Sequence, residues 1–133
     1  MVVRYDYLWQ DEGRRGRREG VKVRPCAVVV ARRMESESEV TVLLAAITHS
    51  EPRDTGTAIE IPISIKRLLG LDEARSWIVL SEVNAAHWSD PGIVPASVHS
   101  WSYGSLPPAF ARKIIDVVLA RFRIGQVHVM RRK

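Results

Sequence analysis

An unbroken apolar stretch places the tightest limit on how this chain can fold. Residues Cys26–Ala31, CAVVVA, are all apolar and rich in valine, which favours a strand. A strand of this kind cannot turn either side to water, so we predict that Val23–Ala31 lies in the centre of a sheet. Cys26 is the only cysteine, and we expect a small buried hydrophobe here rather than a nucleophile or metal ligand.

A basic loop, residues 12–22, leads directly into this strand. Its cations are Arg14, Arg15, Arg17, Arg18 and Lys22. Arginine presents a planar fork of N–H donors to phosphate, so the loop suits a polyanion such as nucleic acid. The alternative is a solvated loop that keeps a small protein in solution. Arg24 differs from these residues because it stands at the mouth of the strand, where a side chain can be held in place.

Composition indicates one globular domain that spans residues 1–133. The chain is 46% hydrophobic and 26% charged, and its formal charge of +5 implies attraction to anionic partners. No apolar run approaches the roughly 18 residues that would span a bilayer. The N-terminus also lacks the pattern of a signal peptide. We therefore expect a cytoplasmic protein.

Further short elements follow from apolar runs and turn residues. Strands are predicted at Tyr5–Trp9, Val40–Ile47, Ala58–Ile63, Ser76–Val83 and around Val98–Trp101, with a polar connection at Met34–Glu39. Pro62 should place its strand at an edge or end it. A brief helix is expected over Ser64–Leu69, capped by Ser64 and stopped by Gly70.

A C-terminal helix is predicted at about residues 107–123. Ser105 is a possible cap, and Ala111, Ile115, Val118 and Phe122 recur at the spacing of one helix face. That face should pack on the sheet, while the second apolar row could contact a partner subunit or complete the protein's own core. In the basic tail 128–133, the last three residues, Arg131, Arg132 and Lys133, are expected to be a frayed end rather than a binding arm. Together the elements predict a mainly β fold with α, a small antiparallel β-barrel plus helices.

At this point the residues resemble the MazF/PemK family of growth-inhibitor toxins. The resemblance covers roughly residues 5–123. It depends on the Arg24-Pro25 pair that opens the valine-rich strand, on Ile47-Thr48-His49-Ser50 at the end of the next strand, on Gly70-Leu71, and on the segment 103–108 before the last helix.

The resemblance implies a fold, an activity and partners. The fold would be the family's PemK/MazF-like, SH3-like barrel with a C-terminal helix. The activity would be that of a toxin from a toxin-antitoxin system, a sequence-selective endoribonuclease that cleaves single-stranded RNA without a metal or other cofactor. The partners would be single-stranded RNA, a cognate antitoxin protein and a second copy of the chain in a homodimer.

Two catalytic residues carry over from the family, Arg24 and Thr48, with Ser50 as a substrate contact. The RNA 2′-hydroxyl would attack the adjacent phosphorus, and a fixed guanidinium and a hydroxyl donor would stabilise the charge that builds on the phosphoryl oxygens. Arginine is a poor base, so the general base stays open. His49 is one candidate for it, although neighbours in a strand point to opposite faces.

The remaining RNA contacts are predicted from charge and position. They are Arg15, Arg17, Arg18 and Lys22 in the basic loop, with His49 and Ser50 after the strand. Trp88 and Trp101 could stack on unpaired bases or cap the core or a dimer interface, whereas Trp9 and Trp77 are expected in the core. Many family members have an acidic or amide residue and then a basic one after the strand equivalent to Ser76–Val83. Here Glu82 and Asn84 are the nearest such residues, and no arginine follows closely. The alternative function is a non-catalytic barrel that binds nucleic acid or a protein.

Overall fold

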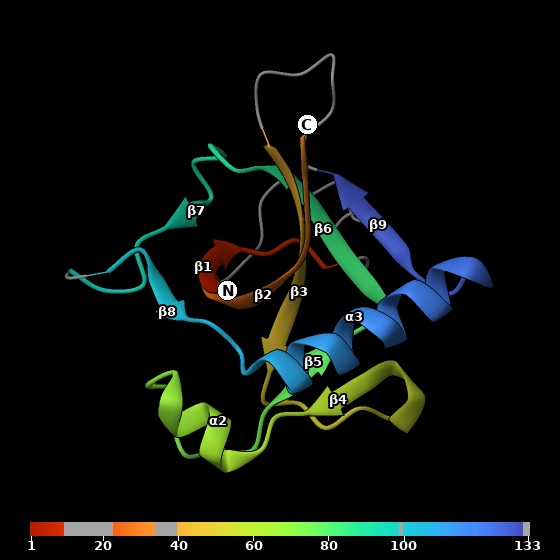
Figure 1. Ribbon diagram of the computed structural model, residues 1–133, viewed down its shortest axis with the longest axis horizontal. Helices are drawn as coiled ribbons and strands as arrows, with labels where there is room; N and C mark the ends of the chain where they lie inside the picture. The colour runs from red at the N-terminus through yellow and green to blue at the C-terminus, as the bar shows by residue number, and fades with distance from the viewer. Residues whose placement is uncertain (10–22, 34–39, 99, 132–133) are drawn as a thin grey trace.

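The protein is mainly β, as the sequence predicts. The computed structural model in Figure 1 describes residues 1–9, 23–33, 40–98 and 100–131. In chain order its elements are β1 (Val2–Asp6), β2 (Val23–Arg33), β3 (Val40–Thr48), the short 3-10 helix η1 (Thr55–Thr57), β4 (Ala58–Glu60), α2 (Ile63–Leu68), β5 (Trp77–Val79), β6 (Glu82–His87), β7 (Ile93–Val94), β8 (Ser102–Gly104), α3 (Pro108–Arg123) and β9 (His128–Arg131).

The sheet is built around β3. Strand β2 pairs with it antiparallel along one edge, while β6 pairs with the first part of its other edge and β5 with the last two residues. Strand β1 continues the sheet beyond β2 and is followed by β7 and β8. Strand β4 pairs with β5, and β9 lies parallel to β6. Strand β2 is therefore internal, which confirms the prediction from its apolar run.

The closed barrel predicted from the sequence does not form among the described residues. The sheet ends at β4 on one side and at β7 and β8 on the other. Strands β7 and β8 are only two and three residues long. Pro91 and Pro95 flank β7 and lack the N–H that a further ladder would need, so this edge cannot extend.

Both faces of the central strands are buried. Ala27 and Ala45 belong to one apolar cluster, and their neighbours Cys26 and Ala46 belong to another. Helix α3 lies over the first cluster and buries Ile114 and Val118, each 1% exposed. Burial of a side chain of this size stabilises the fold by about 1.5–3 kcal/mol. Val118, Ala111 and Phe122 of the predicted face thus pack on the core, while Ile114 of the second row, not Ile115, is buried beside Val118.

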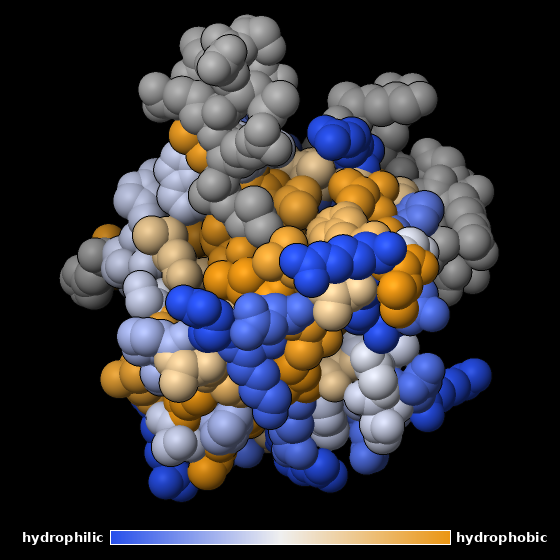
Figure 2. All heavy atoms as spheres, turned by 45° about the vertical axis from the view of Figure 1, so that its right-hand side comes forward, coloured by the Kyte–Doolittle hydropathy of each residue, from blue (hydrophilic) through white to orange (hydrophobic). Residues whose placement is uncertain are grey.

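The outer side of α3 keeps some apolar surface. Leu119 is 42% exposed, and Ile124, just after the helix, is 67% exposed. Figure 2, turned toward the side of α3 and β9, shows apolar side chains gathered between hydrophilic ones. No helix in the described ranges is both long and apolar enough to cross a membrane.

Both helices end in the same glycine-dependent motif. At the end of α2 the Gly70 N–H donates to the Arg67 carbonyl and the Leu71 N–H to the Lys66 carbonyl. Gly125 and the residue after it repeat this pattern at the end of α3. The two glycines have φ of 67° and 71°, which favours glycine, so the predicted stop at Gly70 is confirmed.

Both helices begin within one residue of the predicted starts, but the predicted N-caps are wrong. Pro62 and Pro107, not Ser64 and Ser105, occupy the N-cap positions, and neither makes a side-chain cap hydrogen bond. Proline is favoured at a helix start because its missing N–H would have no partner inside the helix. The predicted end of the preceding strand near Pro62 is confirmed, and β4 is an edge strand.

Several strand boundaries also differ from the prediction. Strand β1 begins and ends earlier than predicted. The stretch 76–83 is divided after Val79 into β5 and β6, which pair with different parts of β3. The Leu80 N–H donates to the Thr57 carbonyl at 2.7 Å and so extends the register of the β4–β5 pair. Val98 is 94% exposed near a turn, and the strand predicted there lies at β8.

The basic tail is a strand over much of its length. Residues 128–131 form β9, with Val127 and Val129 packed on the core. Arg131, the first residue of the end predicted to be frayed, thus lies in a strand. Residues 132–133 and the predicted connection 34–39 lie outside the described residues.

Candidate functional site

Arg24 and Thr48 meet at one end of the β2–β3 pair. The strands pair with Cys26 across from Ala46, and the same register continued by two residues sets Arg24 across from Thr48. Residues directly opposite each other in an antiparallel pair share a face of the sheet. Both line one pocket of about 380 Å³. The structure thus brings together the two residues that the sequence places at a strand start and a strand end.

The pocket is assembled from segments far apart in the sequence. Its other lining residues are Trp9, Ser50, Glu51, Pro52, Thr57, Ala58 and Val79. They come from the chain after β1 and β3, from η1, and from the small β4–β5 pair. The volume lies in the range of small-ligand pockets, about 300–1,000 Å³. A phosphate with its attached sugar fits this range.

Arg24 is held against an aromatic ring and has one donor without an acceptor. Its guanidinium carbon lies 5.0 Å from the centre of the Trp9 ring. The Nε atom is buried, and no acceptor within the described ranges reaches it. A buried donor without a partner costs about 1–3 kcal/mol, and native structures contain few such groups. An oxyanion bound in the pocket would satisfy it.

Thr48 is oriented as a second donor. The Ser50 N–H donates to Thr48 Oγ1 at 3.1 Å. A hydroxyl carries one proton and two lone pairs, so this bond occupies a lone pair and leaves the proton to donate. The same hydrogen bond turns the chain directly after β3, which places Ser50 and Glu51 on the pocket wall.

Asn84 fixes the segment that carries Trp9. Its side-chain amide donates to the Leu8 carbonyl at 2.8 Å, and its Oδ1 accepts from the Leu8 N–H at 2.7 Å. Tyr7 meets the Trp9 ring edge-on, with 4.8 Å between ring centres. Asn84 is 3% exposed. Asn84, whose role the sequence leaves open, is therefore a buried clamp behind the pocket wall.

Trp9, expected in the core, is partly buried against a core cluster and also lines the pocket, which the sequence did not predict. Strand β1 ends at Asp6, so Trp9 belongs to the chain that leaves the sheet toward the basic loop. Its position beside a cationic loop was the signal that could have identified it. Trp77, by contrast, is 7% exposed in β5, and its predicted core position is confirmed.

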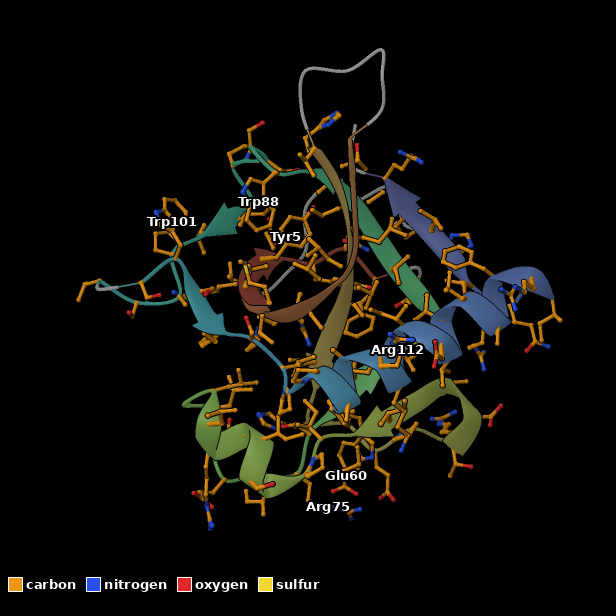
Figure 3. All side chains as sticks on the ribbon, viewed as in Figure 1. Tyr5, Glu60, Arg75, Trp88, Trp101 and Arg112 are labelled. Carbon is orange, nitrogen blue, oxygen red and sulfur yellow. The ribbon has the colours of Figure 1, made fainter. Side chains whose placement is uncertain are left out.

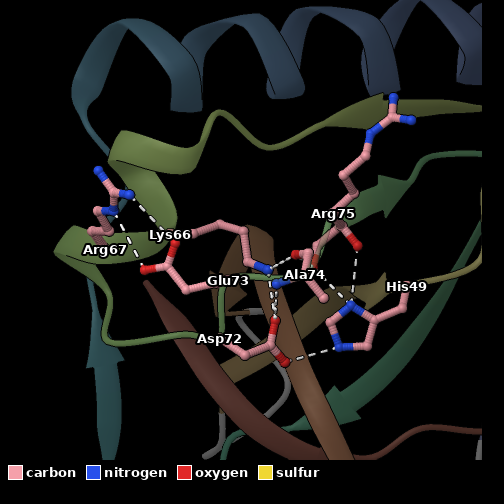
Figure 4. Close-up of polar contacts among 8 residues, drawn as sticks. His49, Lys66, Arg67, Asp72, Glu73, Ala74 and Arg75 are labelled. Atoms are coloured by element: carbon pink, nitrogen blue, oxygen red, sulfur yellow. Dashed lines mark hydrogen bonds and ion pairs between the residues drawn. The ribbon is translucent and has the colours of Figure 1, made fainter.

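His49 has its own set of contacts, and Figure 4 shows its imidazole between Asp72 and the backbone of Arg75. Its Nε2 lies 2.9 Å from Asp72 Oδ2, and its Nδ1 lies 3.0 Å from the Arg75 carbonyl oxygen. It does not line the pocket with Arg24 and Thr48. Because successive strand residues alternate in direction, Thr48 and His49 diverge at the end of β3. The predicted RNA contacts His49 and Ser50 are therefore separated, and Ser50 alone lines the pocket.

The His49 contacts continue to a buried lysine. Lys66 is 1% exposed, and its Nζ donates to Asp72 Oδ1 at 2.8 Å and to the Ala74 carbonyl. The hydrogen bond from Lys66 is the main cause that lowers the pKa of Asp72, and the nearby His49 adds to it. We call these residues, His49, Lys66, Asp72 and Ser76, the histidine network.

The histidine network contains the residue types of a nucleophilic triad, but its geometry does not suit one. Ser76 Oγ lies 3.1 Å from His49 Nδ1, and Asp72 faces the other ring nitrogen. Ser76 is 1% exposed and donates to the Ala74 carbonyl at 3.2 Å. A nucleophile must reach its substrate, so this serine has a structural role.

The other residues predicted from the sequence fall outside the pocket. Arg15, Arg17, Arg18 and Lys22 lie outside the described residues. Cys26 is fully buried, and burial raises the pKa of its thiol, as expected for a small core residue. Among the residues that the structure describes, no group of three or more His, Cys, Asp and Glu side chains could hold a metal ion.

Trp88 and Trp101 line a different pocket. They are 44% and 66% exposed, so neither is a core cap. Together with Val3, Ile93 and Pro95 they border an apolar pocket of about 680 Å³. Figure 3 shows both indoles on the side of β7 and β8, at the opposite end of the view from Glu60 and Arg75 near β4 and β5.

Comparison with known proteins returns no family model, no curated protein and no solved structure that matches this chain. The residues that carry the MazF/PemK resemblance are those named from the sequence. Of these, Arg24, Thr48 and Ser50 line the pocket.

Proposed function

We propose that this protein is an endoribonuclease toxin of the MazF/PemK type, which cleaves single-stranded RNA in the pocket formed by Arg24 and Thr48. One observation carries the proposal. Arg24, whose buried Nε–H has no acceptor among the described residues, lines the same pocket as Thr48, whose hydroxyl is oriented as a donor. This arrangement suits an oxyanion with more than one exposed oxygen, and phosphate is such a group.

The proposed reaction needs no cofactor. The 2′-oxygen of a ribose attacks the adjacent phosphorus, the bond from phosphorus to the 5′ oxygen breaks, and the products carry a 2′,3′-cyclic phosphate and a 5′-hydroxyl. Negative charge builds on the nonbridging oxygens in the transition state. Arg24 and Thr48 would donate to those oxygens, and each well-placed donor is worth about 2.7–4 kcal/mol by analogy with oxyanion holes.

The family assignment adds partners and a finer fold to the proposal. A cognate antitoxin protein and a homodimer are part of it, as is the family's SH3-like barrel. The mainly β sheet with α3 packed on its central strands supports the coarse architecture. The basic loop 12–22 would guide the RNA backbone toward Arg24, because the loop is followed directly in the sequence by the start of β2, where Arg24 lies.

The test is cleavage of a long single-stranded RNA by purified protein in the presence of a chelator. We expect fragments with 2′,3′-cyclic phosphate ends, and a rate at least about 100-fold lower for Arg24→Ala. Arg112→Ala is the matched control, since it removes an exposed arginine of α3 that does not line the pocket. Wild-type protein that binds RNA but never cuts it would support the non-catalytic alternative, and cleavage only after metal is added would contradict the mechanism.

A further inference from the structure

The pocket contains a carboxylate that the MazF/PemK resemblance does not assign. Glu51 follows Thr48 by three residues and lines the pocket together with it and with Arg24. The Ser50 N–H bond to Thr48 turns the chain there, and Pro52 restricts the backbone of Glu51 to extended conformations. In the described part of the chain the Glu51 carboxylate has no hydrogen bond or ion pair within bonding distance.

The reaction proposed above requires a group that takes the proton of the 2′-hydroxyl. Among the described lining residues, only Arg24 and Glu51 carry ionisable groups that are charged near neutral pH. A guanidinium does not act as a base at such pH, because its pKa exceeds about 12. His49, the other candidate, is engaged by Asp72 outside the pocket. We propose that Glu51 is the general base of RNA cleavage, an inference that rests on the proposed function.

The charged groups around Glu51 suit this role. Arg24 lines the same pocket. Arg75 lies close enough that Glu51, after Glu60, helps to raise the pKa of the guanidinium. The Arg75 fork is already occupied, since its Nε and Nη2 donate to the Glu60 carboxylate at 2.8 and 2.9 Å.

The nearest charged residues of the same loop do not compete for Glu51. Asp54 accepts from the Gly56 N–H at 2.9 Å, and Arg53 is exposed. Two cations thus lie near Glu51 without closing an ion pair on it. The carboxylate stays available to a substrate hydroxyl.

The step balances without a co-reactant. The 2′-hydroxyl proton moves to a carboxylate oxygen of Glu51 while the bond from the 2′-oxygen to phosphorus forms. The bond from phosphorus to the 5′ oxygen breaks, and the leaving oxygen takes a proton from water. Glu51 then returns its proton to solvent, so the enzyme is regenerated.

The experiment is a single-turnover pH–rate profile for wild type and Glu51→Gln, with RNA as substrate. For wild type we expect the rate to rise with pH through the acid range and then level, the profile of catalysis by a carboxylate base. In Glu51→Gln the rate should fall about 10²- to 10⁴-fold and this acid limb should disappear. Glu73→Gln is the matched control, because Glu73 is an exposed carboxylate bound to Arg67 away from the pocket.

Binding of an uncleavable RNA with a 2′-deoxy sugar at the cut site shows whether the variant is folded. Glu51→Gln should bind it at least as tightly as wild type, since a negative charge near the phosphate has been removed. Rates for Glu51→Gln within about threefold of wild type, with the acid limb retained, would overturn the inference alone. No cleavage by the wild type would overturn the proposed function first and the role of Glu51 with it.

Discussion

Thr48 and His49 are neighbours in sequence, yet their side chains enter two different environments at the end of β3. On one side lies the pocket with Arg24, where a buried donor has no acceptor in the described part of the chain. On the other side lies the histidine network, where both ring nitrogens of His49 and the buried ammonium of Lys66 have partners.

This difference shows that residue types alone do not identify a catalytic site, because the hydrogen-bond partners of each polar group must also be counted. The histidine network has the residue types of a catalytic site, but its hydrogen bonds are satisfied within the protein. The Arg24 pocket has fewer ionisable groups, and the buried Nε–H of Arg24 has no acceptor among the residues that the structure describes. Because unpaired buried groups are rare in folded proteins, we infer ligand binding at the pocket and a structural role for the network.

The prediction with the largest expected effect concerns RNA cleavage and tests whether the pocket or the histidine network is the catalytic site. Thr48→Val removes the hydroxyl at nearly the same volume and should lower the cleavage rate about 10²- to 10³-fold. His49→Gln changes the adjacent residue and should leave the rate of folded protein unchanged at neutral pH. Single-turnover rates for the two variants measure this. The reverse order of effects would assign the chemistry to the histidine network.

Much of the fold follows from the sequence because apolar runs report directly on burial. Strands β2 and β3 contain apolar runs, and helix α3 has an apolar helical periodicity. Each of these patterns is compatible only with burial in the core. The break after Val79 is different, because β5 and β6 pair with different parts of β3, a strand distant in the sequence. The open edge at β7 and β8 likewise depends on how a proline-rich connection packs, which no local pattern specifies.

The candidate site divides in the same way. Arg24 and Thr48 stand at a strand start and a strand end, so antiparallel pairing alone predicts that they meet. Trp9 reaches the pocket because Asn84, 76 residues away from Leu8, clamps the preceding backbone. Glu51 reaches it through the turn that Ser50 makes on Thr48. Contacts of this kind form only in the folded chain, so sequence patterns miss them.

The next effect is on stability and tests the histidine network. Asp72→Ala leaves the buried Lys66 ammonium with the Ala74 carbonyl as its remaining partner, and should lower the free energy of unfolding by about 3 kcal/mol. The double variant Lys66→Met/Asp72→Ala should recover most of this loss, because no buried charge remains. Urea unfolding curves measure both. A double variant as unstable as Asp72→Ala would show that the lost ion pair, and not the Lys66 ammonium left without its carboxylate, causes most of the loss in unfolding free energy.

The smallest expected effect is on how the unfolding free energy depends on pH, and it again distinguishes the histidine network from the pocket. The folded state lowers the pKa of Asp72 below that of the unfolded chain, so its ionised form contributes stability above the unfolded value of about 3.9. That contribution is lost as the pH falls through the lower, folded pKa. The difference in unfolding free energy between wild type and Asp72→Asn should therefore shrink steadily between about pH 5 and pH 3.

Glu60→Gln is the comparison for this loss of stability at acid pH. The Arg75 hydrogen bond lowers the pKa of Glu60 in the same direction, but the pair is exposed and screened by solvent, so its limb should be shallower. Denaturation curves across this pH range distinguish the two variants. Because Asp72 is outside the pocket, Asp72→Asn should also leave the acid limb of RNA cleavage in place. If the cleavage rate of Asp72→Asn no longer rose with pH in the acid range, the histidine network would take part in catalysis. That result would contradict the structural role inferred from its hydrogen bonds.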